Sequence, residues 1–295
     1  MGNRAKNQWI YVLGVCAVTA FFLCAGPAWA APDSDLWDRW LIHDENSTTT
    51  VDHDAWNTLL QKFVVFGDDG INRVAYGWII GGDKMMLDEY LDDLSRVSVS
   101  SLSRDEQRAY WINMYNALTI NVVLDAGKIT SIRDIDISPG FFSNGPWGKK
   151  LITVEGESLS LDDIEHRILR PIWQDPRIHY ALNCAALSCP NLWGVAVTVE
   201  NIETYLNHGA KAFINHPRGS RVEGGRVVAS SIYKWFAEDF GGTDAAIIDH
   251  IKGYASDDLV AALDGVTDVE FESYDWTLNS NVLPNLVAVG TRRGS

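Results

Sequence analysis

The first pattern in the chain is a recurrence of apolar side chains every three or four residues, the spacing of one face of an α-helix. It is clearest from Glu106 to Leu124, where apolar residues occupy both sides of the helix, as they do in buried helices. Asn113 shares a side with Ile120 and Leu124, so we expect its amide to be buried and hydrogen-bonded. The same spacing predicts shorter helices that begin near residues 54, 87, 160, 201, 230 and 244.

Two further signals locate ends of elements. Ser160 and Asp163 resemble a capping box, and Pro171 is expected to end the helix that they begin. Residues alternate between polar and apolar from Arg177 to Cys184, which predicts a strand with His179 and Cys184 on opposite faces. Further short strands or hairpins are expected at 63–66, 71–76, 150–154, 221–229 and 269–274.

These elements interleave along the chain without a clear βαβ repeat. We therefore predict an α+β fold, a single globular domain of interleaved helices and a small mixed or antiparallel sheet. The expected order is an N-terminal extension and loop at 31–54, the domain at 55–279 and a loosely ordered tail at 280–295.

The first thirty residues have the pattern of a secretory signal peptide. Arg4 and Lys6 precede an apolar run from residue 9 to 25, and Ala28-Trp29-Ala30 fits the cleavage pattern of small residues. The run is short for a membrane span, which favours cleavage after Ala30 over an uncleaved anchor. We expect residues 1–30 to be removed and the mature protein to be periplasmic or secreted, with no stable membrane span.

Composition narrows the class of protein. Hydrophobic residues make up 46% of the chain, which argues against disorder. The 24 basic and 39 acidic residues give a formal net charge of −15, which argues against a nucleic-acid partner because phosphate contacts need clustered Lys and Arg. We expect an acidic protein whose ligand is a small molecule, a glycan or a peptide.

Several segments resemble a known family. They are Tyr110–Leu118, Leu159–Pro171, Asp175–Pro190, Trp235–Gly242 and Tyr274–Asn279. In this order they are similar to the domain-of-unknown-function family 547 (DUF547) and cover most of residues 55–279. The resemblance implies the domain but no established activity.

One hypothesis for the chemistry is a cysteine enzyme. A cysteine nucleophile needs a base and an orienting group, and Cys184 or Cys189 with His179 and Asn113 would supply these types. Against it, the two cysteines that remain after cleavage tend to pair in an oxidising compartment. The short loop between them favours a Cys184–Cys189 disulfide, which would remove the thiol.

A second hypothesis uses carboxylate and histidine chemistry without the thiol. Glu165 and His166 leave the core face of their predicted helix, and His179 and Asn183 share one face of the predicted strand. A cleft between these elements could hold a general base poised near neutral pH. The plainer alternative is that each of these residues is a satisfied core polar group or lies on a solvated face.

A third hypothesis is a binding module without catalysis. The loop from Phe141 to Gly148 is rich in glycine and aromatic residues, and exposed rings such as those of Phe141 and Trp147 suit sugars or peptides. Asn116 and Asn183 are candidate hydrogen-bonding partners for a ligand. We expect no cofactor and no metal, since the Asp52-His53-Asp54 run is a weak metal motif.

Overall fold

The structure is a computed structural model that describes residues 32–139 and 145–281. These residues lie in one compact unit with the α+β architecture that the sequence predicts. The predicted signal peptide at 1–30, Phe141 and residues 282–295 of the predicted tail lie outside the described residues. Within the described ranges, none of the helices is both long and apolar enough to cross a membrane.

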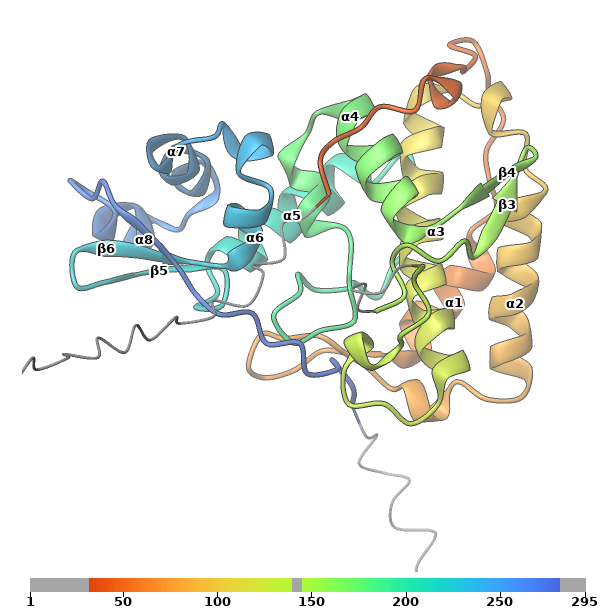
Figure 1. Ribbon diagram of the computed structural model, residues 1–295, viewed down its shortest axis with the longest axis horizontal. Coiled ribbons are helices and arrows are strands. Elements are labelled where there is room, and N and C mark those ends of the chain that lie inside the picture. The colour runs from red at the N-terminus through yellow and green to blue at the C-terminus, as the bar shows by residue number, and fades with distance from the viewer. Residues whose placement is uncertain (1–31, 140–144, 282–295) are drawn as a thin grey trace, which may run out of the picture. The chain divides into compact units, whose positions relative to one another are not determined.

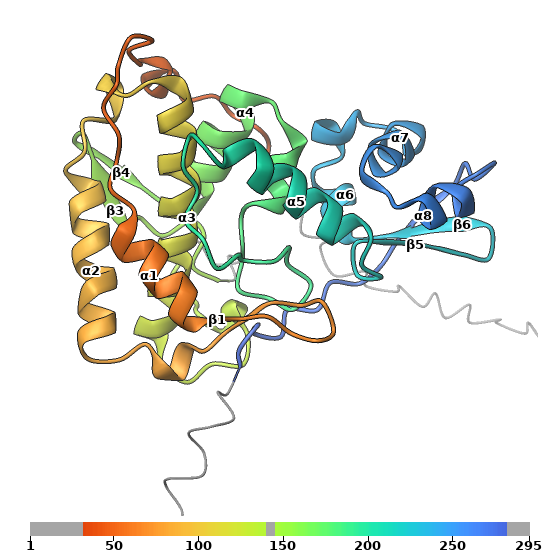
Figure 2. The same cartoon turned by 180° about the vertical axis from the view of Figure 1, so that it is seen from behind.

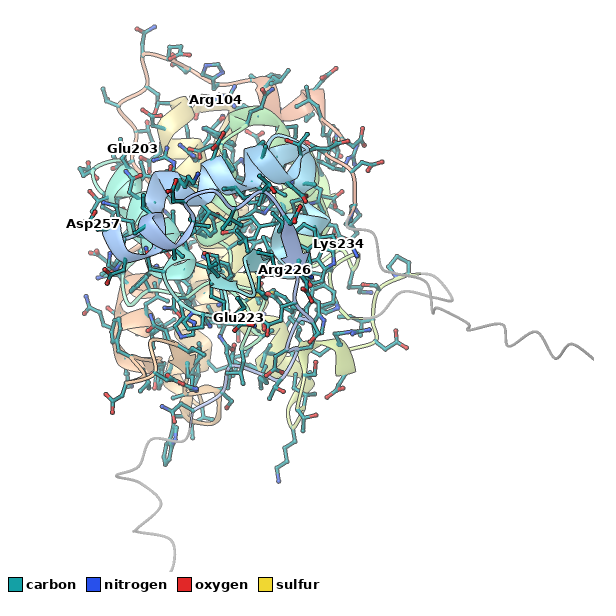
Figure 3. The ribbon with its side chains drawn as sticks, turned by 90° about the vertical axis from the view of Figure 1, so that its left-hand side faces the viewer. Arg104, Glu203, Glu223, Arg226, Lys234 and Asp257 are labelled. Atoms are coloured by element: carbon teal, nitrogen blue, oxygen red, sulfur yellow. A yellow bond between two sulfur atoms is a disulfide. The ribbon has the colours of Figure 1, made fainter. Side chains whose placement is uncertain are left out.

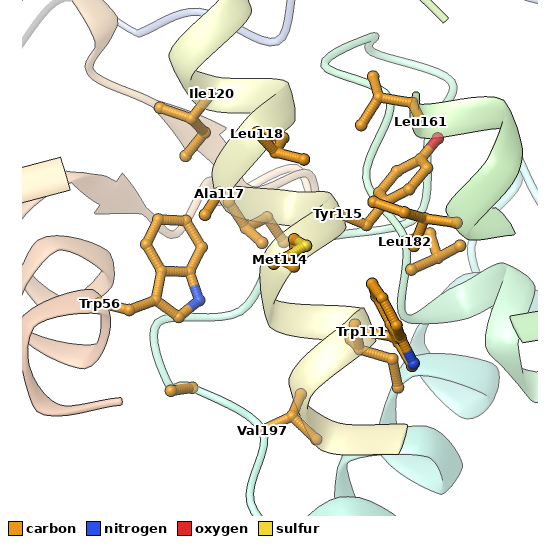
Figure 4. Close-up of a cluster of buried hydrophobic side chains, with 14 of the residues drawn as sticks. Trp56, Trp111, Met114, Tyr115, Ala117, Leu118, Ile120, Leu161, Leu182 and Val197 are labelled. Atoms are coloured by element: carbon orange, nitrogen blue, oxygen red, sulfur yellow. The ribbon is translucent and has the colours of Figure 1, made fainter. Parts of the chain in front are cut away.

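The long helix α3 (Arg104–Ala126) lies in the larger of two hydrophobic cores. Helix α2 (Gly82–Ser95) packs on α3, and α1 (Asp54–Phe63) packs on α2 (Figures 1 and 2). Trp56 faces one side of α3, while Leu161 and Leu182 lie on the other side (Figure 4). Every residue from 106 to 120 is buried, so the predicted helix with two apolar sides is confirmed.

Short strands form the predicted hairpins. The pairs are β1 (Val64–Val65) with β2 (Arg73–Val74), β3 (Ile152–Val154) with β4 (Glu157–Leu159), and β5 (Ser220–Glu223) with β6 (Arg226–Ala229), all antiparallel. Strand β7 (Val269–Phe271) joins β6 in parallel, so the largest sheet described is mixed. Gly224 and Gly225 form the β5–β6 turn with φ of 57° and 80°, which glycine adopts without strain.

A second core lies between this sheet and the C-terminal helices. The helices are α5 (Ile202–Ile214), α6 (Ser231–Trp235), α7 (Asp244–Tyr254) and α8 (Asp257–Ala262). Phe213, Tyr233 and Ile251 are buried among them. Charged side chains such as Glu223, Arg226 and Asp257 lie on the outside of this part (Figure 3). Short 3₁₀ helices occupy Asp38–Leu41, Tyr76–Trp78, Val99–Ser101, Ile132–Asp134, Pro176–Tyr180 and Ala237–Phe240.

The helix after Ser160 begins as predicted but ends later. Ser160 Oγ accepts a hydrogen bond from Asp163 N at 3.2 Å, and Asp163 Oδ2 accepts one from Ser160 N at 2.8 Å, which confirms the capping box. The helix runs as a π-helix over Asp163–Leu169 and continues as α4 (Arg170–Trp173). The prediction that Pro171 ends it is wrong, because the helix continues through Pro171 to Trp173.

The predicted strand at 177–184 is also wrong. Pro176–Tyr180 form a 3₁₀ helix, and Asp175 caps it by accepting a hydrogen bond from Arg177 N at 2.9 Å. An Asp-Pro pair is a helix-start signal, and here it overrides the alternation of side chains. Without a strand, His179 and Cys184 are not held on opposite faces of one element.

The N-terminal extension packs against the π-helix. The backbone N–H groups of Asp35 and Trp37 each donate to a carbonyl of that helix, His166 O and Arg167 O, at 3.0 Å. Trp40 is buried in the larger core. The described part of residues 31–54 therefore covers the helix that carries Glu165 and His166.

Candidate functional site

His179 lies in a buried polar cluster. Its Nε2 is 2.6 Å from Asp239 Oδ2, and its Nδ1 is 3.8 Å from Glu165 Oε1. Phe236 stacks on its ring with 4.2 Å between the ring centroids. The imidazole is thus held between two carboxyl groups that lie far from it in the sequence.

Arg170 fixes the carboxylate behind His179. Its Nε and Nη2 donate to the two oxygens of Asp239 at 2.6 and 3.1 Å, in the two-pronged geometry typical of Arg–carboxylate pairs. Burial opposes ionisation of Asp239, but hydrogen bonds from His179 and Arg170 outweigh it and lower the pKa of Asp239. Asp239 is therefore an anion at neutral pH and accepts hydrogen bonds from both neighbours.

This arrangement sets the tautomer of His179. Burial lowers the pKa of His179, although Asp239 works against that shift, so the ring is neutral at pH 7. An ionised carboxylate only accepts hydrogen bonds, so the Nε2–H of His179 donates to Asp239. The lone pair of Nδ1 then faces Glu165.

Glu165 has the side chain best suited to exchange protons near neutral pH. Burial raises its pKa to about 7, while a hydrogen bond from Tyr115 and the charge of Arg170 act in the opposite direction. Tyr115 extends from α3 toward the helix that carries Glu165 and Leu161 (Figure 4). At pH 7 Glu165 is a mixture of acid and carboxylate, as a general acid–base requires.

Two more titratable side chains, those of His166 and Asp162, lie on the same helix as Glu165. His166 Nδ1 accepts a hydrogen bond from Arg170 Nη1 at 3.1 Å, and burial lowers the pKa of His166 to about 3, so it is neutral. Asp162 Oδ1 lies 3.7 Å from His166 Nε2, and burial raises the pKa of Asp162 to about 6. We call Glu165, His166, Arg170, His179 and Asp239 the Glu165 cluster.

Cys184 and Cys189 form a disulfide with their Cα atoms 6.0 Å apart. Cys189 is buried, whereas Cys184 is partly exposed and its Sγ lies 3.2 Å from Tyr274 Oη. The structure thus joins the two cysteines as the sequence predicts, and in this state neither sulfur is a thiolate.

Tyr274 belongs to a group of rings. Its neighbours are Trp276 at 4.6 Å and Trp235 at 4.8 Å, and Trp147 lies 5.5 Å from Trp276. We call Trp147, Trp235, Tyr274 and Trp276 the aromatic cluster. Burial raises the pKa of Tyr274, while the charge of Arg218 opposes this rise and that of Glu165 adds to it. Trp235 directly precedes Phe236, whose ring stacks on His179, so the aromatic cluster and the Glu165 cluster are neighbours.

The three candidate asparagines hold backbone segments instead. Asn113 donates to Val197 O at 2.7 Å and accepts from Val197 N at 2.9 Å, so the predicted buried and bonded amide is confirmed. Asn116 bonds in the same way to Ala181 O and Asn183 N, at 2.9 Å each. Asn183 donates to Pro190 O at 2.7 Å. These amides are used within the fold and do not join the Glu165 cluster.

The sequence predicts a site that contains His179 and Glu165, but its local patterns do not point to Asp239, Arg170 or Tyr115. Asp239 lies 60 residues after His179 and 69 after Arg170, so no spacing rule connects them. The available signal was a charged pair, Glu238-Asp239, inside an aromatic segment that resembles the family. In the described ranges, no group of three or more His, Cys, Asp or Glu side chains is arranged to hold a metal ion.

The geometry defines an α+β domain with a buried histidine between two carboxyl groups. Residues 99–214 match the family model described as "Protein of unknown function, DUF547". The chain therefore carries a DUF547 segment, as the resemblance predicts, and this segment includes Glu165, His179 and both cysteines. None of the curated proteins and none of the solved structures matches the chain.

Proposed function

We propose that the protein is an exported hydrolase or transferase of the cell envelope that uses Glu165 as its general acid–base. The observation that carries the proposal is the row Asp239–His179–Glu165, in which the pKa of Glu165 is about 7. Buried titratable groups with shifted pKa values and specific partners are characteristic of catalytic sites. The proposed export rests on the signal-peptide pattern of residues 1–30.

The division of roles follows from which atoms are already engaged. His179 is 2% exposed and has a carboxyl group at each ring nitrogen, so it is a positioning residue that acts through Glu165. Asp239 is held by both His179 and Arg170. Glu165 is 12% exposed, one of its oxygens lies 3.8 Å from the neutral imidazole, and its pKa of about 7 is the higher of the two, so Glu165 holds the proton that is exchanged. In this proposal Glu165 gives a proton to the leaving group or takes one from the attacking water.

A specific observation also favours a second function, that of a binding module. The aromatic cluster presents four partly exposed rings beside the Glu165 cluster, and such rings stack on sugars or planar groups. In this alternative the polar cluster holds the fold together and the rings bind a ligand that leaves unchanged.

A comparison of three proteins tests the proposal: the oxidised mature chain, Glu165→Gln and Glu89→Gln. Glu89 is exposed on α2 and controls for the loss of one carboxylate. Each is assayed with p-nitrophenyl acetate, p-nitrophenyl glycosides and peptide p-nitroanilides. We expect turnover in one class, reduced at least about 100-fold by Glu165→Gln and unchanged by Glu89→Gln, since general acid–base catalysis supplies about 10²–10⁴ in rate.

Two results would contradict the enzyme proposal. One is equal turnover by the wild type and Glu165→Gln. The other is no turnover of any substrate class together with saturable binding of the same compounds, which would favour the binding module.

A further inference from the structure

Two neighbouring pockets lie on a face that shares no lining residue with the Glu165 cluster. Helix α1, helix α5 and the segment that leads into α5 form this face (Figure 2). One pocket is polar with a volume of about 530 Å³, and the other is apolar with a volume of about 290 Å³. Val195 and Asn201 line both, so the pockets are two halves of one groove. Their volumes are of the size that binds small ligands or short peptide segments.

The apolar half exposes side chains that a folded protein normally covers. Phe66 is 63% exposed and Val195 is 45% exposed, and both line this half together with Trp193. The indole Nε1 of Trp193 is buried and has no hydrogen-bond partner among the described residues. An apolar side chain of a ligand would cover the exposed ring of Phe66 and the exposed side chain of Val195.

The polar half is negatively charged. Its charged lining residues are Asp52 and Asp54, and neither Lys nor Arg lines either half. His53 lines the same half and is only 6% exposed. Its Nδ1 lies 2.7 Å from Tyr90 Oη, while its Nε2 has no hydrogen-bond partner among the described residues. Burial lowers the pKa of His53 to about 4, so the ring adds no positive charge at pH 7.

The segment between the two halves is held in place before any ligand binds. Asn57 Oδ1 accepts from Ala196 N at 3.0 Å, and Asn201 Nδ2 donates to Ala196 O at 2.9 Å. The next residue, Val197, has both backbone groups bonded to Asn113 on α3. A groove fixed in this way binds without a large loss of conformational entropy.

We propose that this groove binds an extended peptide segment in which an aromatic or large aliphatic residue stands next to Lys or Arg. The apolar side chain would lie against Phe66 and Val195, and the cation would lie beside Asp52 and Asp54. Gln61 is exposed and lines the polar half, and its amide can pair with the N–H and C=O groups of a peptide backbone. The strongly acidic chain favours a basic partner as well.

The test measures the binding of acetyl-Gly-Phe-Lys-Gly-amide to the oxidised mature protein by calorimetry and by shifts of the Trp indole NMR signals. Two matched peptides replace Phe by Ala or Lys by Glu. In the protein, the double variant Asp52→Asn, Asp54→Asn removes the two negative charges of the polar half. The control double variant Asp257→Asn, Asp258→Asn removes the same charge from exposed positions on α8 (Figure 3 labels Asp257).

We expect the Asp52, Asp54 double variant to raise the Kd of the Phe-Lys peptide about tenfold or more, and the α8 double variant to leave it within about twofold. Phe66→Ala removes a ring that is 63% exposed, and it is a second, independent variant. This variant should weaken the binding of the Phe-Lys peptide and leave the binding of the Ala-Lys peptide unchanged. Equal weakening by both charge variants would show non-specific attraction and overturn the proposal. So would equal binding of all three peptides, or no saturable binding of any.

Discussion

Replacing Glu165 by Gln should make the protein more stable at pH 8, and the gain in stability should be much smaller at pH 5. The reason is that burial raises the pKa of Glu165 from 4.5 to about 7 in the folded protein. The folded state therefore binds this proton more tightly than the unfolded chain does. The stabilisation is fully present below about pH 4.5 and is lost as the pH rises through 7. The amide that replaces the carboxyl group has no ionisable proton, so the variant lacks this pH dependence.

The size of the effect follows from the two pKa values. Each unit of difference corresponds to about 1.4 kcal/mol, which gives a limit of about 3–4 kcal/mol well above pH 7. Between pH 5 and pH 8 the free energy of unfolding of the wild type should fall by about 2–3 kcal/mol relative to that of Glu165→Gln. Asp162 also titrates in this range and its charge raises the pKa of Glu165, so the difference between the two proteins includes the coupling of these two carboxyl groups.

Urea unfolding at pH 5, 6, 7 and 8 measures this difference directly. Glu89→Gln, an exposed substitution on α2, is the control and should follow the wild type at every pH. Parallel curves for the wild type and Glu165→Gln would refute the reasoning, because they would mean that Glu165 is ionised in the folded protein as easily as in the unfolded chain. A wild type that gains stability with pH relative to Glu165→Gln would also refute it.

Three further predictions concern other parts of the chain. N-terminal sequencing of the exported protein should begin at Ala31, and a mature chain that still starts at Met1 would contradict the signal peptide. Alkylation of the native protein without reductant should modify neither Cys184 nor Cys189, and uptake of label by both in mass spectrometry would show that the disulfide is absent. Asn113→Leu should lower the free energy of unfolding by about 1–3 kcal/mol in urea, because Val197 loses both hydrogen-bond partners; an unchanged midpoint would show the pair to be dispensable.

The parts of the fold that sequence patterns predict well are those stabilised by local rules. The helix from 104 to 126 is long, apolar on two sides and free of Pro and Gly, so its periodicity is unambiguous. The capping box at Ser160 and Asp163 also depends only on neighbours three residues apart. The strand predicted from the alternation at 177–184 is wrong because the pattern spans only eight residues. The Asp175-Pro176 start signal favours a 3₁₀ helix there.

The candidate site could be predicted only in part, for a different reason. Glu165 is predicted because it leaves the core face of its helix, and His179 is predicted because it is a polar residue in a largely apolar segment. Asp239 and Arg170 were not, because their roles depend on contacts across 60 and 69 residues that only the folded chain creates. Yet these two decide the chemistry: without Asp239 the tautomer of His179 would be open, and Arg170 is one of the two groups whose hydrogen bonds keep Asp239 ionised against its burial. The proton that Glu165 exchanges near pH 7 is thus controlled by residues that no local pattern connects to it.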